Sequence, residues 1–160
     1  MTIETIAWAI DAGADPGALA AAWGAGRPAP IPIGRTWDII RLSPSLGAQA
    51  LARTRHLGRV GPVLRTTASR TFEVVVPLGT AHSWPHLPGT CAVSSGALLC
   101  PPPTATVGRP DTAGSGRLWI CSPLSGVDPT DPHALCEGAA AALARRCAGP
   151  DAFGGTHVQM

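Results

Sequence analysis

Apolar residues recur at helical spacing near the start of the chain, which predicts two helices there. The apolar positions of residues 3–10 lie on one helical face, and Gly13 ends the segment. Asp15 followed by Pro16 is typical of a helix start, because the aspartate caps the first turn and the proline fits its backbone angle. The second helix is therefore expected to run from Asp15 to Gly24 or Gly26.

Two further helices are predicted from the same signals. Ser43 and Pro44 begin one that Gly58 ends, and its apolar stripe consists of Leu46, Ala50, Leu51 and Leu57. Residues 131–147 form an alanine-rich segment that begins with Asp-Pro and ends with two arginines, as expected for a long helix.

Strand patterns lie between these helices. Residues 29–42 favour strands, and the prolines within them place Ile31 to Ile33 at a sheet edge. The segments GPVLRTT and TFEVVVPLG predict two strands joined by a short turn around Ala68 and Ser69. Residues 96–123 predict a hairpin, in which three consecutive prolines end the first strand at Cys100 and a loop returns to a second strand before Pro123.

This order of elements predicts an α+β fold, with one mixed or antiparallel sheet and helices packed on it. We expect a single domain over residues 1–147, and a disordered tail over the Gly-rich, polar residues 148–160.

Composition agrees with a globular chain, since 45% of the 160 residues are hydrophobic and 14% are charged. The N-terminus carries Glu4 and lacks the basic region of a signal peptide, and no apolar stretch is long enough to cross a membrane. A cytoplasmic protein is therefore expected, with no membrane partner, and its 5 cysteines should be reduced.

Charge is distributed unevenly, although the net charge is only +2. All 12 basic residues are arginines, and eight of them lie between Arg27 and Arg70 against the single acid Asp38. Such a block is typical of a phosphate-binding surface, but arginines on separate solvated faces would give the same sequence. The candidate nucleic-acid contacts are Arg35, Arg41, Arg53, Arg55, Arg59, Arg65 and Arg70.

Catalytic and metal-binding patterns are sparse. His82, His86, Cys91 and Cys100 are zinc-ligand types, but their spacing matches no zinc motif, and no cofactor is expected. Two-metal nucleotidyl transfer requires grouped carboxylates, whereas Asp38 and Glu73 are the only acids between Asp15 and Asp111. These two are the weak catalytic candidates. A Mg²⁺ or Mn²⁺ cofactor is expected only if the two carboxylates act together in catalysis.

Three fragments resemble the N-terminal domain of bifunctional DNA primase/polymerases, in the archaeo-eukaryotic primase superfamily. They are AWGAGRPAPIPIGR, GPVLRTTASRTFEVVVP, and GALLCPPP followed by GRLWI, within Trp23 to Ile120. The resemblance implies an RRM-like sheet whose flanking arginines hold nucleic acid through its phosphates. Stacking on aromatic residues is not expected to help, because Trp8 and Trp23 lie on predicted helices and should belong to the core.

The chain departs from this family at each catalytic motif. WDIIRL replaces the Asp-x-Asp strand, TASRTF lacks the histidine, and TCAVSSG lacks the later aspartate. The resemblance therefore implies a non-catalytic relative that binds single-stranded nucleic acid or nucleotide. Two alternatives stay open: a protein-interaction or regulatory module that uses the uncharged residues 74–108, and an active nucleotidyltransferase that uses Asp38 and Glu73.

Overall fold

The protein is described by a computed structural model, which covers residues 2–109 and 115–147. Within them lie five helices, α1 (Ile3–Asp11), α2 (Pro16–Gly24), α3 (Pro44–Leu57), α4 (Thr80–Ser83) and α5 (Pro132–Cys147). The strands are β1 (Ala29–Pro32), β2 (Trp37–Leu42), β3 (Val63–Thr66), β4 (Phe72–Pro77), β5 (Thr90–Val93), β6 (Ala97–Cys100) and β7 (Arg117–Cys121). The predicted α+β class, with antiparallel strands and helices packed on them, is confirmed.

The strands form two antiparallel sheets. Five of them follow the order β5-β2-β4-β3-β7, and β1 pairs with β6 in a separate two-stranded sheet. Gly34 turns the chain between β1 and β2 with a positive φ of 93°, and it lies directly against the backbone of Ser94. After this turn the chain enters the other sheet. The predicted strand region, residues 29–42, therefore contributes β1 to the small sheet and β2 to the five-stranded sheet.

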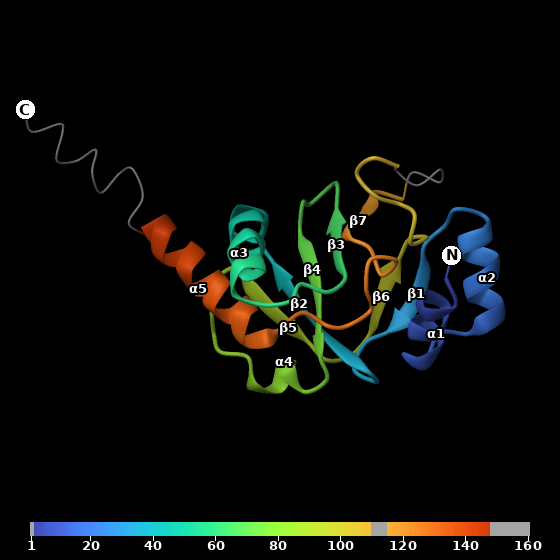
Figure 1. The fold of residues 1–160 in the computed structure, drawn as a ribbon, viewed down its shortest axis with the longest axis horizontal. Coiled ribbons are helices and arrows are strands. Elements are labelled where there is room, and N and C mark those ends of the chain that lie inside the picture. The colour runs from blue at the N-terminus through green and yellow to red at the C-terminus, as the bar shows by residue number, and fades with distance from the viewer. Residues whose placement is uncertain (1, 110–114, 148–160) are drawn as a thin grey trace, which may run out of the picture.

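Each face of the five-stranded sheet has its own apolar core. On one face, α3 and α5 cover Ile40, Leu42, Val74 and Val76. On the other face, α1, α2 and the small sheet cover a core in which Trp8, Trp23 and Trp37 are buried. Figure 1 shows α3 and α5 at one side of the central sheet and α1, α2, β1 and β6 at the other. The prediction that Trp8 and Trp23 belong to the core is confirmed.

The helix boundaries follow the predicted signals closely. Asp15 caps α2 through a 2.8 Å hydrogen bond from the Ala18 N–H to its Oδ2. Asp131 caps α5 by accepting from the His133 N–H at 3.0 Å. In α3 the expected stripe is buried except at Leu57, which is 44% exposed at the end of the helix. None of the helices in the described residues is both long and apolar enough to cross a membrane.

The predicted hairpin of residues 96–123 is wrong. Among the described strands β6 pairs only with β1, whereas β7 pairs with β3 in the other sheet. The three prolines cause this separation, because they cannot donate ladder hydrogen bonds and they carry the chain from one sheet to the other. Their carbonyls hold the crossing in place: Pro101 accepts from the Trp119 Nε1–H at 3.1 Å, and Pro103 accepts from the Ser122 hydroxyl at 2.6 Å.

Helix α4 and strand β5 were not expected from the sequence. They lie in the uncharged segment, where Pro85 and Pro88 predicted a loop. β5 forms because Thr90 to Val93 align with Leu42 to Ile39 of β2, a tertiary contact that the local sequence does not encode. The predicted tail, residues 148–160, lies outside the described residues.

Candidate functional site

A polar cleft lies between the two sheets, at the end of β2 that leads into α3. Its volume is about 340 Å³, and β2, β3, β4, β6 and β7 all contribute to its walls. The lining side chains combine two arginines, one carboxylate and three hydroxyl groups, namely Arg41, Arg117, Glu73, Thr66, Ser69 and Thr71. We refer to these six residues as the arginine cleft.

Glu73 lies at the base of the arginine cleft with a side chain that is only 5% exposed. Its Oε2 accepts from Arg41 Nε at 3.0 Å, and its Oε1 accepts from Arg117 Nη2 at 2.5 Å. Arg117 is also fixed by a 2.6 Å bond from its Nε to the carbonyl of Leu99 on β6. Because a buried carboxylate requires such partners, Glu73 holds both guanidinium groups in defined positions.

The register of the sheet explains why these groups meet. Arg41 is paired directly with Glu73 across β2 and β4, so both side chains leave the same face. Arg117 is paired with Thr66 across β7 and β3. One carboxylate and two guanidinium groups leave the arginine cleft with a net positive charge.

Asp38 is placed on the opposite face of the sheet from Glu73. Successive residues of a strand point to opposite faces of the sheet. Asp38 therefore lies on the same face as Ile40, and Ile39 and Arg41 lie on the other face. The Asp38 Oδ2 accepts from the backbone N–H groups of Gly79 and Ala81, at 2.9 and 3.0 Å. Asp38 therefore fixes the turn into α4, and the two weak catalytic candidates do not converge.

The predicted arginines also separate onto different parts of the molecule. Arg41 alone of the seven lines the arginine cleft. Arg65 lies on the α3 side, with its guanidinium 5.6 Å from the centre of the Phe72 ring. Arg53 is exposed on α3, and Arg70 is exposed in the β3–β4 turn.

The other three predicted arginines contact residues outside the arginine cleft. Arg55 donates to the sulfur of Cys121 at 3.5 Å, and Arg59 donates to the Pro129 carbonyl at 3.1 Å. Arg35 lies against Gly13, in the turn between β1 and β2. Arg55, Arg59 and Arg35 therefore contact residues other than those of the arginine cleft.

Sequence reasoning missed Arg117 as a site residue, because it is 44 positions from Glu73 and lies outside the basic block. The only local signal is an arginine at the start of the apolar run LWIC, where a strand would present it beside a buried neighbour.

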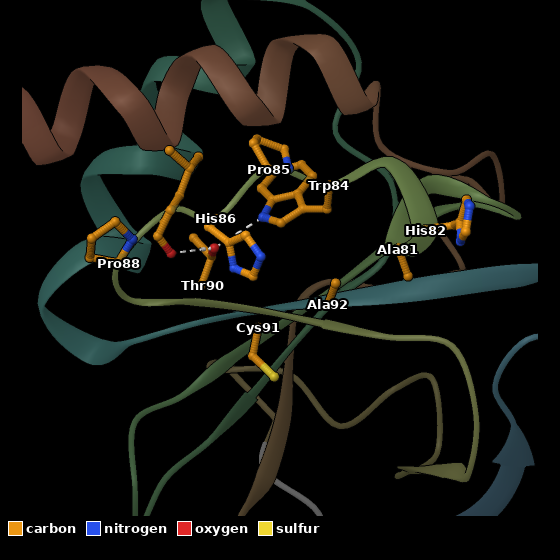
Figure 2. Close-up of a pocket in the computed structure, with 10 residues that line it drawn as sticks. Ala81, His82, Trp84, Pro85, His86, Pro88, Thr90, Cys91 and Ala92 are labelled. Carbon is orange, nitrogen blue, oxygen red and sulfur yellow. Dashed lines mark hydrogen bonds between the residues drawn. The ribbon is translucent and has the colours of Figure 1, made fainter.

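A second, larger cavity of about 650 Å³ lies beside β5 (Figure 2). It is bordered by α4, the proline-containing loop and β5, and no Asp, Glu, Lys or Arg lines it. Trp84 donates from Nε1 to the Thr90 hydroxyl at 3.0 Å, which ties the loop to the strand. In Figure 2, His82 and Cys91 point away from His86, so these zinc-ligand types do not surround a common point.

No group of three histidine, cysteine or acidic side chains within metal-binding reach occurs in residues 2–109 and 115–147. Burial raises the pKa of the Cys100 thiol, and the nearby Glu73 carboxylate raises it further, whereas Arg117 acts in the opposite direction. Cys100 is therefore a protonated core residue in the folded protein.

Comparisons with protein-family models, with curated proteins and with solved structures gave no significant match to this chain.

Proposed function

We propose that the protein is a non-catalytic, primase/polymerase-like domain that binds a phosphate-bearing ligand, a nucleotide or single-stranded nucleic acid, in the arginine cleft. The observation that carries the proposal is the pair of guanidinium groups held by buried Glu73 beside three hydroxyls. Arg41 is 43% exposed in its side chain, so its remaining N–H groups can reach a ligand. Arginine and hydroxyl donors suit phosphate oxygens because the hydrogen bonds are charge-assisted.

The proposal assigns no chemistry to Asp38 and Glu73. Each carboxylate already accepts two hydrogen bonds, and the two lie on opposite faces of one sheet. Two-metal catalysis needs carboxylates that bridge ions a few ångströms apart.

Binding is tested with fluorescein-labelled (dT)12 and with competing ATP, both followed by anisotropy at low salt. The Arg41→Gln variant should weaken binding by about tenfold, equivalent to about 1.4 kcal/mol. Arg53→Gln is the matched control, because Arg53 is an exposed arginine of the same block on the α3 side. No binding by the wild type, or an equal loss in both variants, would overturn the proposal.

Primer extension separates binding from catalysis. Wild-type protein and Asp38→Asn should both give no incorporation with Mg²⁺ or Mn²⁺. Incorporation by the wild type that Asp38→Asn abolishes would support the nucleotidyltransferase instead.

A second candidate function is peptide binding at β5, which is favoured by the uncharged cavity of about 650 Å³. In the described residues β5 pairs only with β2, so its other edge is open to an added strand. Wild-type protein should then capture one consistent partner from nuclease-treated extract. Ala92→Arg on β5 should lose that partner, and Ala52→Arg, at an exposed position of α3, should keep it.

A further inference from the structure

The two sheets of the described chain have four edges, which are formed by β5, β7, β1 and β6. An open edge carries unpaired N–H and C=O groups that can pair with another strand. Natural proteins therefore protect such edges with proline, with charge or with a covering segment. Here β1, β6 and β7 are protected, whereas β5 is not.

The three protected edges use different means. Strand β1 has the sequence APIP, and its prolines have no N–H group to offer. Beside β7, the Trp119 N–H donates to the Ala105 carbonyl at 2.8 Å, so a further segment of the chain covers this edge. At β6, the Leu99 carbonyl accepts from the charged Arg117 side chain at 2.6 Å.

Strand β5 has none of these devices. Its sequence, TCAV, contains no proline and no charged residue, and its register with β2 runs without a bulge. Among the described strands only β2 pairs with it. Cys91 and Ala92 are exposed, so the outer side of β5 is accessible to another strand.

The hydrogen-bond pattern shows which backbone groups of β5 point outward. The Ser43 N–H donates to the Gly89 carbonyl at 2.8 Å, directly beyond the last paired residues of β2 and β5. Because bonded pairs alternate along an antiparallel ladder, Cys91 takes the next bonded position toward β2. The N–H and C=O of Ala92 therefore point away from β2, in the middle of the open edge.

Two properties of this edge favour a second copy of the chain as its occupant. A peptide that paired with β5 would become the new edge and expose its own unpaired groups, whereas two β5 strands paired with each other leave neither edge open. A two-fold contact also places the same surface on both sides, so a charged patch would repel itself. Residues 74–108, which include α4 and β5, contain no Asp, Glu, Lys or Arg, and no such charge opposes self-contact.

We infer that two copies of the chain pair through β5 as a symmetric antiparallel dimer, which joins their five-stranded sheets into one continuous sheet. The two-fold axis passes between the Ala92 residues, so that the N–H and C=O of one bond those of the other. Cys91 then lies opposite Val93 of the second copy. Ala92 borders the cavity of about 650 Å³, which leaves room for side chains beside the axis. The dimer does not depend on the arginine cleft, but it leaves no free edge for the peptide of the second candidate function.

The association is measured on the full-length wild type by sedimentation equilibrium. A reversible monomer–dimer equilibrium with a Kd of about 10–100 µM is expected, because a four-residue strand provides a small interface. Hydrogen exchange then locates the contact. The Ala92 amide should exchange about threefold more slowly at about 500 µM than at about 5 µM protein. The Ala18 amide, which caps α2 far from β5, should not change.

Paired charge variants test whether the occupant is a second copy. Ala92→Arg and Ala92→Glu each place like charges opposite each other across the axis, so either variant alone should be monomeric. A mixture of the two should form a heterodimer, because opposite charges then face each other. Ala52→Arg and Ala52→Glu, at an exposed position of α3, are the matched controls and should each dimerise like the wild type.

A wild type that stays monomeric up to about 500 µM would overturn the inference and leave a partner peptide as the occupant of β5. A dimer that persists in each Ala92 variant alone would also overturn it, since the contact would then lie elsewhere. If these variants fail to fold, the wild-type amide decides. Exchange at Ala92 that does not slow as the wild type dimerises would contradict pairing through β5.

Discussion

Glu73 is held by partners on two different strands, and this position defines its role. Its carboxylate is buried, and its two oxygens accept from Arg41 and from Arg117. The guanidinium groups gain fixed directions from the same bonds, and Arg41 still faces solvent with part of its side chain. Glu73 is therefore a positioning residue for the proposed phosphate site.

Replacing Glu73 by Gln should weaken both stability and binding. The free energy of unfolding should fall by about 3 kcal/mol, because two arginines lose a buried counter-charge. Affinity for (dT)12 should fall in the folded variant, because Arg41 and Arg117 lose the bonds that fix their directions. Urea unfolding and anisotropy measure the two effects, with Glu137→Gln as the exposed control. Unchanged or higher affinity of a folded Glu73→Gln protein for (dT)12 would contradict this role.

The cysteines should differ sharply in reactivity. Cys100 is fully buried and its pKa is raised by burial, whereas Cys91 is exposed on β5. Brief treatment with iodoacetamide at about pH 8, followed by peptide mass spectrometry, should modify Cys91 and spare Cys100. Equal modification of the two thiols in native protein would contradict the prediction.

The Cys100 thiol also makes the free energy of unfolding depend on pH. Folded Cys100 keeps a proton that the unfolded chain releases near its ordinary pKa of 9.0. Its contribution to stability is thus complete below this value and decreases as the pH rises above it. Urea unfolding between about pH 8 and 10 should show a shallower decrease in Cys100→Ala than in the wild type.

At the scale of elements, α3 and α5 form a close helix pair that covers one face of the sheet. Gly138 of α5 lies against α3, where an added Cβ would stand 2.6 Å from the Ala50 carbonyl oxygen and from the Thr54 hydroxyl. The Thr54 hydroxyl also donates to this carbonyl at 2.6 Å, so neither group can move independently. The helices approach this closely because position 138 has no side chain.

Gly138→Ala should therefore lower the free energy of unfolding by about 2 kcal/mol through overpacking. Gly24→Ala is the matched control at the end of α2, where an added Cβ meets no atom within 4 Å. It should leave stability unchanged or raise it by up to about 1 kcal/mol, because alanine is the better helix former. Thermal unfolding of both variants measures the difference; equal effects would argue against the close contact.

At the scale of the whole molecule, Arg41 lines the arginine cleft, whereas the other six predicted arginines do not. The arrangement of arginines makes a quantitative prediction for nucleic-acid binding. If Arg41 and Arg117 alone contact phosphates, the slope of log K against log salt for (dT)12 should be about −1.4. A continuous surface of seven arginines would instead give about −5. Anisotropy titrations at several salt concentrations distinguish these values.

The sequence alone determined the local elements whose signals lie within a few residues. Asp15-Pro16 and Asp131-Pro132 set the starts of α2 and α5, because a cap and the following N–H groups are neighbours in the chain. The segments GPVLRTT and TFEVVVPLG, with the short turn around Ala68 and Ser69, likewise predicted the paired β3 and β4. The α+β class followed from the order of these elements.

Only the tertiary structure decided which elements pair and which side chains meet. It divided the strands between two sheets, separated β6 from β7, and made an edge strand of Thr90 to Val93. It also joined Arg117 to Glu73, and placed Asp38 on the opposite face. The physical reason is that caps and turns depend on adjacent residues, whereas sheet register and buried ion pairs depend on contacts between segments far apart in the chain.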